Sequence, residues 1–528
     1  MKNKIYLALI LLLAIVLRYY NNTSISLWHD EAFSALLIKY NWGEMLYRIG
    51  LDVHPPMYYI FLRFWHYIFG DSLLSLRSMT VFFSVGTVYA AWLFVKEAFR
   101  SDKAALWAAV LVAVNPFQVQ YATEARMYTM GAFFTVMAAY FLTKTINSEN
   151  SIYESESQHI PHLPKNIALN RTRLLSYLGF VLSICVMIYT HYYLLFSAAA
   201  ICAYGLIYKI FHHRGGYKKY TYLILSYLLI AVSYIPWLSS FMYQYRQVGA
   251  GYWIPPMDRW SVPSTLWTLL VGFSHNVQNP STQKWLLVVT LITISLVIWF
   301  IKKTSIFHKW LVLFGILAPF MGSLLFLLLA RLKGSSSSVY LVRYFLYTSA
   351  FFSSLVALWL IQLKYKWLAA VLLLSYLVLN LAAYVSYWKD LKISERPGMR
   401  AAAHYLATNA EEGQPVFVAT SFEFFNYKYY RNVYYHTPAK PLLFTGGEKY
   451  AKNISHFAGS AILTDEDLAP SFVEKTKPGQ TAWLVWTYAF GSNKPLLPDS
   501  WSLINEMEYP DVRPYVGTSI YVSQYRVN

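Results

Sequence analysis

The sequence predicts a mainly α-helical protein: a polytopic transmembrane helix bundle with a small C-terminal α/β domain. Of its 528 residues, 57% are hydrophobic and 13% are charged, whereas about a quarter of the residues of a soluble protein are charged. Apolar runs of roughly 20 residues, long enough to cross a hydrocarbon core, recur throughout residues 1–385. From residue 386 onward the chain is more polar and its charges balance.

We predict about eleven spans, with a margin of about two on either side. The first run follows Lys2 and Lys4, as in a signal peptide, but no small-residue cleavage site comes before Asn21. We therefore interpret it as a span. The predicted spans lie near residues 4–20, 72–97, 104–121, 128–144, 174–190, 192–211, 220–238, 284–301, 310–330, 341–362 and 366–385.

The charge distribution predicts the orientation. From residue 386 onward, 14 basic residues match 14 acidic ones, so the formal charge of +18 belongs to the membrane part. This charge indicates topology and contact with anionic membrane lipids, not nucleic-acid binding. With a cytoplasmic N-terminus, every inner loop is basic, as the positive-inside rule requires. We therefore expect a multi-pass protein of the cytoplasmic membrane. The inner loops are residues 96–103, 144–173, 209–219, 302–309 and 364–366.

Residues 21–71 form the predicted catalytic outer loop within the transmembrane domain, residues 1–385. The loop is too hydrophobic to be a solvated linker, and residues 32–49 and 56–69 predict helices lying in the membrane interface. Near its start, Asp30 and Glu31 place two adjacent carboxylates in a chain with few acids. A helix start offers a structural explanation for the same pair, because acids suit the positive end of the helix dipole.

Other polar groups are expected on the same outer face. His54 follows Asp52 and precedes two prolines, which suits either a helix N-terminus or a rigid turn. Glu124 and Arg126 lie at the mouth of a span, where ionisable groups are costly unless they are paired or functional. A purely structural ion pair between them is the alternative.

Two more segments add basic groups. His191 lies among tyrosines at the outer end of a span, where a histidine also suits an aromatic interface belt. Arg343 and Tyr344 open the tenth span shortly after Lys333. Because an arginine at a helix start is unfavourable for the dipole, we expect Arg343 to have an anionic partner, such as a phosphate.

Six motifs, taken in order, resemble a known family. They are WHDEA, DVHPPMYY, RSMTVFFSV, NPFQVQYATEARMY, YTHYY and VRYF. Each is short, but the ordered set on one predicted face is specific. Over residues 1–385 the chain resembles the bacterial membrane glycosyltransferases of family 39 type in the GT-C superfamily, which are related to protein O-mannosyltransferases, aminoarabinose transferases and RgtA/B/C/D-like enzymes.

The resemblance implies an enzyme that moves a sugar from a polyprenyl-phosphate donor to an acceptor outside the cytoplasmic membrane: a glycolipid, a cell-envelope glycan or a protein. It places a catalytic acid at Asp30, with Glu31 beside it. A second acid matches Glu124, where the aminoarabinose-type enzymes carry Asp. Those enzymes also have Lys before the proline pair, where this chain has His54, a residue only partly charged at neutral pH.

The residues fit this chemistry. Sugar transfer needs a carboxylate to deprotonate the acceptor, whereas a phosphate leaving group needs cations and no general acid. We assign Asp30 as the base, and Glu31 and Glu124 as groups that orient the acceptor or tune the base. Attack opposite the phosphate predicts inversion at the anomeric carbon. The predicted substrate- and phosphate-binding residues are His54, Arg126, His191, Arg343, Tyr344 and Lys333.

No cofactor is predicted. A metal site and two functions other than sugar transfer are the alternatives. Asp30, Glu31, Glu124 and the two histidines could hold a divalent cation, although no spacing is diagnostic of a metal. A solute transporter would show paired halves and charged groups near mid-bilayer. A polytopic lipid-carrier protein without catalytic activity would use the arginines and would not need Asp30.

Residues 386–528 predict a compact α/β domain on the extracytoplasmic side. Strands are expected at residues 415–420, 481–487 and 519–523, and helices at 398–409 and 422–430. No Gly-rich nucleotide-binding motif occurs in it. Acceptor recognition, coverage of the site and a purely structural cap all remain open as its role.

Overall fold

The computed structural model describes residues 2–157, 165–212, 220–250, 254–272, 279–332, 338–437, 439–512 and 517–528. The chain divides into two compact units. The helical unit consists of Met1–Tyr20, Thr80–Ala122 and Met127–Tyr384, and the mixed unit of Asn21–Met79, Thr123–Arg126 and Val385–Asn528. Each is described separately.

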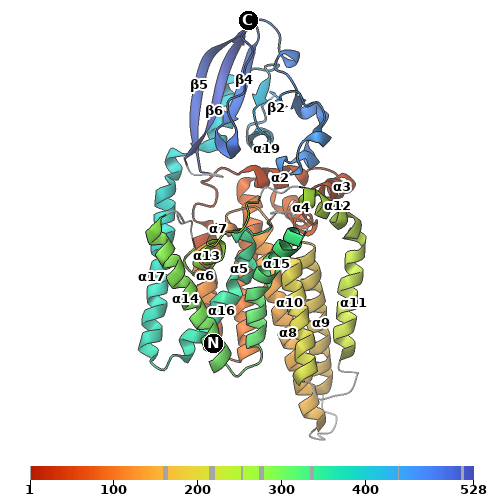
Figure 1. Ribbon diagram of the computed structural model, residues 1–528, viewed down its shortest axis with the longest axis vertical. Helices are drawn as coiled ribbons and strands as arrows, with labels where there is room; N and C mark the ends of the chain where they lie inside the picture. Colours follow the sequence, from red (N-terminus) through yellow and green to blue (C-terminus); the bar gives the residue numbers. More distant parts are fainter. Residues whose placement is uncertain are drawn as a thin grey trace. The chain divides into compact units, whose positions relative to one another are not determined.

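The helical unit is built from long apolar helices, and α8, α9 and α10 run side by side in it (Figure 1). The helix α5 begins in the mixed unit and continues through the helical unit, and α17 does the reverse. The α-helices are α1 (Lys2–Tyr19), α5 (Leu73–Phe99), α6 (Asp102–Val114), α7 (Pro116–Ala122), α8 (Tyr128–Ser157), α9 (Lys165–Ile188), α10 (Leu194–His212), α11 (Thr221–Tyr234), α12 (Leu238–Ala250), α13 (Ser261–Val271), α14 (Pro280–Lys303), α15 (Lys309–Leu332), α16 (Leu346–Gln362) and α17 (Lys366–Leu391).

The predicted spans coincide with these helices. Within the described residues, 9 helices are long and apolar enough to cross a membrane, and the bent pair α6 and α7 would make 10. The remaining predicted span is α1, an 18-residue helix. The polytopic helix bundle predicted from the apolar runs is therefore confirmed.

The bend between α6 and α7 is fixed by local chemistry. Pro116 begins α7, and the preceding Asn115 takes an extended conformation, as residues before proline prefer. The α6 carbonyl oxygens near the break need other donors. The buried Arg18 of α1 supplies them, because its guanidinium donates to Ala113 O at 2.9 Å and to Val112 O at 3.3 Å. An arginine inside a span is thus used to hold a helix bend of 55°.

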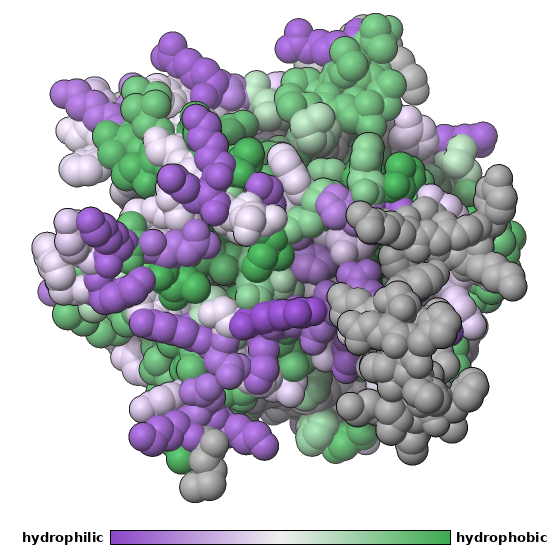
Figure 2. All heavy atoms as spheres, turned by 90° about the horizontal axis from the view of Figure 1, so that it is seen from below, coloured by the Kyte–Doolittle hydropathy of each residue, from purple (hydrophilic) through white to green (hydrophobic). Residues whose placement is uncertain are grey.

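Basic residues gather at one end of the helical unit. Lys96 lies in the last turn of α5, Lys302 and Lys303 lie in the last turn of α14, and Lys366 begins α17. These helix ends lie in the lower part of Figure 1, and Figure 2, seen from below, shows many hydrophilic side chains on that face. This distribution agrees with the loops predicted to face the cytoplasm.

The mixed unit combines the predicted outer loop with the C-terminal domain. The loop forms three short helices, α2 (His29–Leu37), α3 (Trp42–Leu51) and α4 (Met57–Phe69). The C-terminal part adds α18 (Gly398–Asn409) and α19 (Ser421–Tyr430). These are the two helices predicted for the C-terminal domain. The helix α19 packs on α2.

A mixed six-stranded sheet forms the rest of this unit. Its order is β3-β2-β1-β4-β6-β5, parallel from β3 to β4 and antiparallel at β6 and β5. In Figure 1 the long strands β5 and β6 lie beside β4. The three predicted strands correspond to β1, β4 and β6. The strands are β1 (Val416–Val418), β2 (Pro441–Phe444), β3 (Leu468–Ala469), β4 (Thr481–Thr487), β5 (Trp501–Asp511) and β6 (Thr518–Val527).

The C-terminal part holds the segment that leads into α2. The Leu27 amide donates to the hydroxyl of buried Tyr430 at 3.0 Å, and the Ser26 hydroxyl donates to Pro397 O at 3.0 Å. The Arg400 guanidinium donates to Thr23 O at 2.6 Å. Two backbone groups of this irregular segment, Leu27 N and Thr23 O, are thereby satisfied by side chains more than 370 residues away in the chain.

Candidate active site

The first turn of α2 carries the two adjacent acids. Glu31 is the third residue of the helix, and its Oε2 accepts the Trp28 amide at 3.3 Å, which caps the helix start. The side chain of Glu31 is 0% exposed, whereas that of Asp30 is 28% exposed. Although they are neighbours in sequence, only Asp30 offers a carboxylate that a substrate could reach.

Glu31 forms a buried ion pair with Arg77. The two charged groups pair in a bidentate manner, with Nε–Oε1 and Nη2–Oε2 distances of 2.8 Å each. The Ala125 amide also donates to Glu31 Oε1 at 2.8 Å, and Arg77 Nη1 donates to Asn22 O at 2.6 Å. This network fixes the start of α2, the segment before it and residues 123–126 to one another.

Arg126 is the cation next to Asp30. Its Nη1 donates to Asp30 O at 3.2 Å and to the Ser34 hydroxyl at 3.0 Å, and its Nε lies 3.8 Å from Asp30 Oδ2. The Arg126 side chain is 3% exposed. Glu124, two residues earlier, is also buried. The structure therefore brings Asp30, Glu31, Glu124 and Arg126 into one region of the mixed unit.

His54 belongs to the same cluster and bridges two charged groups. Its Nδ1 lies 3.1 Å from Asp52 Oδ2, and its Nε2 lies 3.4 Å from Arg126 Nη2. Because a guanidinium can only donate, Nε2 is the acceptor and Nδ1 carries the proton directed at Asp52. In this arrangement His54 orients Arg126, and the buried Asp52 orients His54.

Aromatic residues around the cluster are uncharged. Burial lowers the pKa of His29, whose ring packs on Phe422 with centroids 4.8 Å apart. Burial also raises the pKa of Tyr58 and Tyr59 well above the usual range, although the nearby Arg126 guanidinium acts in the opposite direction. The carboxylate of Asp30 thus lies beside a positive guanidinium and neutral rings.

A second cluster lies within the helical unit. His191 packs on the ring of Tyr344 with centroids 4.6 Å apart, and its Nδ1 accepts the Tyr193 amide at 3.2 Å. Arg343 Nη1 lies 3.4 Å from the hydroxyl of Tyr128, and the Arg343 Cζ is 5.9 Å from the centre of that ring. The predicted residues His191, between α9 and α10, and Arg343 and Tyr344, in the 3-10 turn (Val342–Phe345) before α16, are therefore close together.

Lys333 lies outside the described residues. Among the residues that the structure describes, no group of three or more His, Cys, Asp or Glu side chains could hold a metal ion. Asp30, Glu31, Glu124 and the two histidines do not form such a group in the described chain, since Glu31 is occupied by Arg77 and by backbone amides.

Sequence reasoning did not assign a role to Arg77 or to Asp52. Arg77 lies in the RSMTVFFSV motif, in the second turn of α5, and an arginine inside a span signals a buried partner. Asp52 immediately precedes the HPP sequence. Neither signal identifies the partner, because Glu31 and Arg77 are separated by 46 residues.

Comparisons with known proteins place this geometry in context. Residues 53–153 match the family model described as dolichyl-phosphate-mannose-protein mannosyltransferase. No curated protein matches the chain. The crystal structure of ArnT from Cupriavidus metallidurans bound to undecaprenyl phosphate has a TM-score of 0.59 at 13% identity, over 98% of this chain and 97% of that one.

A second similar structure is the archaeal oligosaccharyltransferase AglB from Archaeoglobus fulgidus, in complex with an inhibitory peptide and a dolichol-phosphate. Its TM-score is 0.51 at 12% identity, over 92% of this chain and 69% of that one. The chain therefore has the fold of ArnT and AglB, and the resemblance inferred from its motifs is confirmed by these matches. The matched family segment contains His54, Arg77, Glu124 and Arg126.

Proposed function

We propose that this protein is an inverting glycosyltransferase that moves a sugar, a hexose or a pentose, from a polyprenyl-phosphate donor to an acceptor outside the cytoplasmic membrane. The acceptor is a glycolipid, a cell-envelope glycan or a protein. The observation that carries the proposal is one accessible carboxylate, Asp30, held between a buried Glu31–Arg77 pair and the guanidinium of Arg126. The GT-C fold supports the reaction class.

In the proposed reaction, Asp30 takes the proton of the acceptor hydroxyl. The acceptor oxygen attacks the anomeric carbon on the face opposite the phosphate. The bond between that carbon and the phosphate oxygen breaks, and its electron pair leaves with the polyprenyl phosphate. The product therefore has the inverted anomeric configuration.

Cations take the place of a general acid. The leaving phosphate gains negative charge, which preorganised guanidinium groups stabilise. Arg126 suits this role because it is buried and held by Ser34 and His54. We assign His54 to phosphate binding through Arg126, which its Nε2 orients. Arg343, His191 and Tyr344 are assigned to donor binding, with Lys333 as a further cation. Glu31 and Glu124 act as positioning residues.

The proposed location follows from the charge distribution. The basic loops are assigned to the cytoplasm by the positive-inside rule, and counting spans along the chain from a cytoplasmic N-terminus then assigns residues 21–71 and the C-terminal domain to the extracytoplasmic side. The hydrogen bonds from the C-terminal part to residues 23–27 support a structural role for that domain in holding the start of α2.

The test is sugar transfer by purified full-length protein from a labelled polyprenyl-phosphate sugar. We expect Asp30→Asn to lower the rate by about 10²–10⁴-fold, the range of general-base catalysis. Glu44→Gln is the matched control, because Glu44 is an acid of the same loop, 37% exposed and paired with Arg48. Full turnover by Asp30→Asn would remove Asp30 from the role. Movement of the donor without transfer would favour a lipid carrier or transporter.

A further inference from the structure

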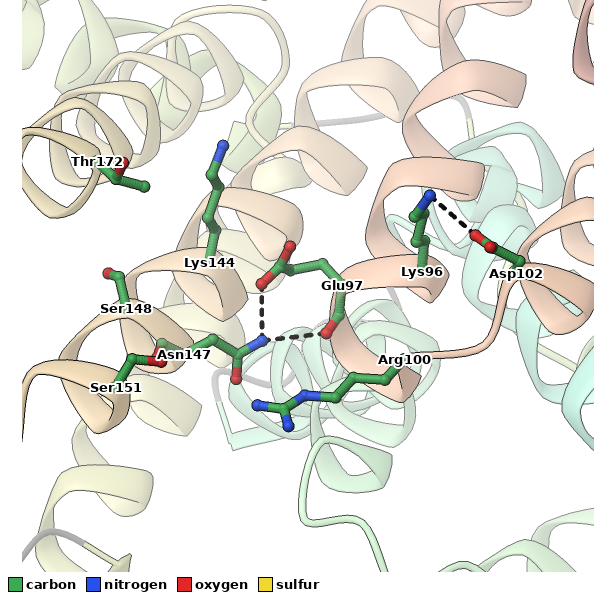
Figure 3. A pocket seen from close by; sticks show the side chains of 9 residues that line it. All are labelled: Lys96, Glu97, Arg100, Asp102, Lys144, Asn147, Ser148, Ser151 and Thr172. Atoms are coloured by element: carbon green, nitrogen blue, oxygen red, sulfur yellow. Dashed lines mark hydrogen bonds and ion pairs between the residues drawn. The ribbon is translucent and has the colours of Figure 1, made fainter. Parts of the chain in front are cut away.

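A cavity lies at the basic end of the helical unit, and none of its lining residues belongs to the candidate active site. Its volume is about 520 Å³, within the range of roughly 300–1,000 Å³ typical of small-molecule sites. Figure 3 shows side chains from the end of α5, the start of α6, α8 and α9 around it. The charged residues that line it are Lys96, Glu97, Arg100, Asp102 and Lys144.

The two acids of the cavity are already engaged. Asp102 accepts from Lys96 Nζ at 2.9 Å and from the Asn3 amide group at 3.2 Å. Glu97 Oε1 accepts from Asn147 Nδ2 at 2.8 Å, and Asn147 also contacts the ring of His308 at 3.4 Å. These contacts tie both carboxylates to the walls of the cavity (Figure 3).

Two cations remain without a carboxylate. Among the residues that the structure describes, neither Arg100 nor Lys144 forms an ion pair, and Arg100 also forms no hydrogen bond. Within the described part of the chain, Lys144 Nζ contacts the hydroxyl of Tyr140 at 3.2 Å and the ring of the same residue. The guanidinium of Arg100 extends across the cavity towards Asn147 of α8 (Figure 3).

His308 adds no third cation. Burial lowers its pKa to about 4, and the charges of Arg100 and His212 act in the same direction. Its Nδ1 lies 2.7 Å from the hydroxyl of Tyr204. His308, which contacts the lining residue Asn147, is therefore neutral at physiological pH, and among the described residues that line the cavity the cations without an ion pair are Arg100 and Lys144.

The backbone at Arg100 is unusual for this residue type. Its φ is 50°, in the left-handed region that residues other than glycine rarely adopt. Arg100 lies in the short connection between Phe99 and Asp102. Asn adopts this left-handed backbone conformation more readily than Arg.

We propose that this cavity binds a phosphate group, that of the headgroup of an anionic phospholipid, between Arg100 and Lys144. The lining residues lie near the ends of the spans that begin or end near Phe99, Asp102, Ser151 and Arg171, and the ends of transmembrane helices are where lipid headgroups are met. Basic pockets between transmembrane helices recognise lipid phosphates through such groups. The site is independent of the sugar transfer proposed above.

The test is native mass spectrometry of the full-length protein with added phosphatidylglycerol or phosphatidylcholine of equal chain length. We expect the protein to prefer phosphatidylglycerol, and Arg100→Asn and Lys144→Gln each to weaken its binding by about fivefold, the effect of one basic group near lipid phosphates. Asn tolerates the left-handed backbone, so Arg100→Asn keeps the fold.

Lys303→Gln is the control, because it removes one exposed positive charge from the same end of the helical unit without lining the cavity. An equal loss in Lys303→Gln, or no loss in the two cavity variants, overturns the proposal. A parallel titration with inorganic phosphate separates the sources. Phosphate binding that Arg100→Asn abolishes, without any preference for phosphatidylglycerol, would overturn the assignment to lipid.

Discussion

Asp30 and Glu31 share a helix turn but have different environments. Glu31 is fully buried, and its oxygens accept from the Arg77 guanidinium and two backbone amides, so its charge is used to hold the fold. Asp30 is partly exposed and lies beside a single guanidinium. The sequence shows two acids without distinguishing them, because the distinction depends on Arg77, 46 residues further along the chain.

The two acids should therefore respond differently to neutralisation. Glu31→Gln leaves the buried Arg77 without its charge partner, which typically costs about 3–5 kcal/mol. We expect the melting temperature of Glu31→Gln to fall clearly in detergent, and that of Asp30→Asn to stay near the wild type. Adding Arg77→Met to Glu31→Gln should recover part of the loss. An unchanged melting temperature for Glu31→Gln would contradict the positioning role.

At the scale of elements, spans are easier to predict than strands. Lipid offers backbone N–H and C=O groups no hydrogen-bond partner. Each apolar run that spans the membrane therefore satisfies these groups within its own helix. The strand β5 was not predicted, because nine of its eleven residues are at least partly exposed and its sequence, WSLINEMEYPD, shows no clean alternation. It is an edge strand that depends on pairing with β6.

The helix α19 contains an acid with a strongly shifted pKa. Burial raises the pKa of Glu423 to about 8, and the charge of Asp511 adds to the shift, while Asn426 donates to its Oε2 at 3.0 Å and acts against it. The folded state thus retains a proton that the unfolded chain releases above its ordinary pKa of 4.5. Its stabilising effect is complete below pH 4.5 and is lost as the pH rises through about 8.

Glu423→Gln should remove this dependence. We expect the melting temperature of the wild type to fall relative to that of Glu423→Gln between pH 6 and pH 9. The corresponding loss in the free energy of unfolding is at most about 1.4 kcal/mol per pH unit. Glu412→Gln, which neutralises an exposed acid of the same domain, should follow the wild type. Parallel curves for the wild type and Glu423→Gln would show that Glu423 is ionised in the folded protein.

At the scale of the whole molecule, the charge distribution predicts sidedness. With both native cysteines, Cys185 and Cys202, replaced by Ser, single cysteines report the topology. An impermeant maleimide should label the Glu448→Cys variant in intact spheroplasts, and should label Lys303→Cys only after permeabilisation. The opposite pattern, or equal labelling of both, would reverse or refute the assigned orientation.

The most direct test of the account compares binding with chemistry in a single variant. Dissociation constants for the polyprenyl-phosphate donor and initial transfer rates are measured on the same preparations of wild type and Asp30→Asn. If Asp30 is the base, the transfer rate falls by about 10²-fold or more while donor affinity stays within a small factor of the wild type. A rate that falls only in proportion to donor affinity, or does not fall, would contradict the claim that Asp30 deprotonates the acceptor.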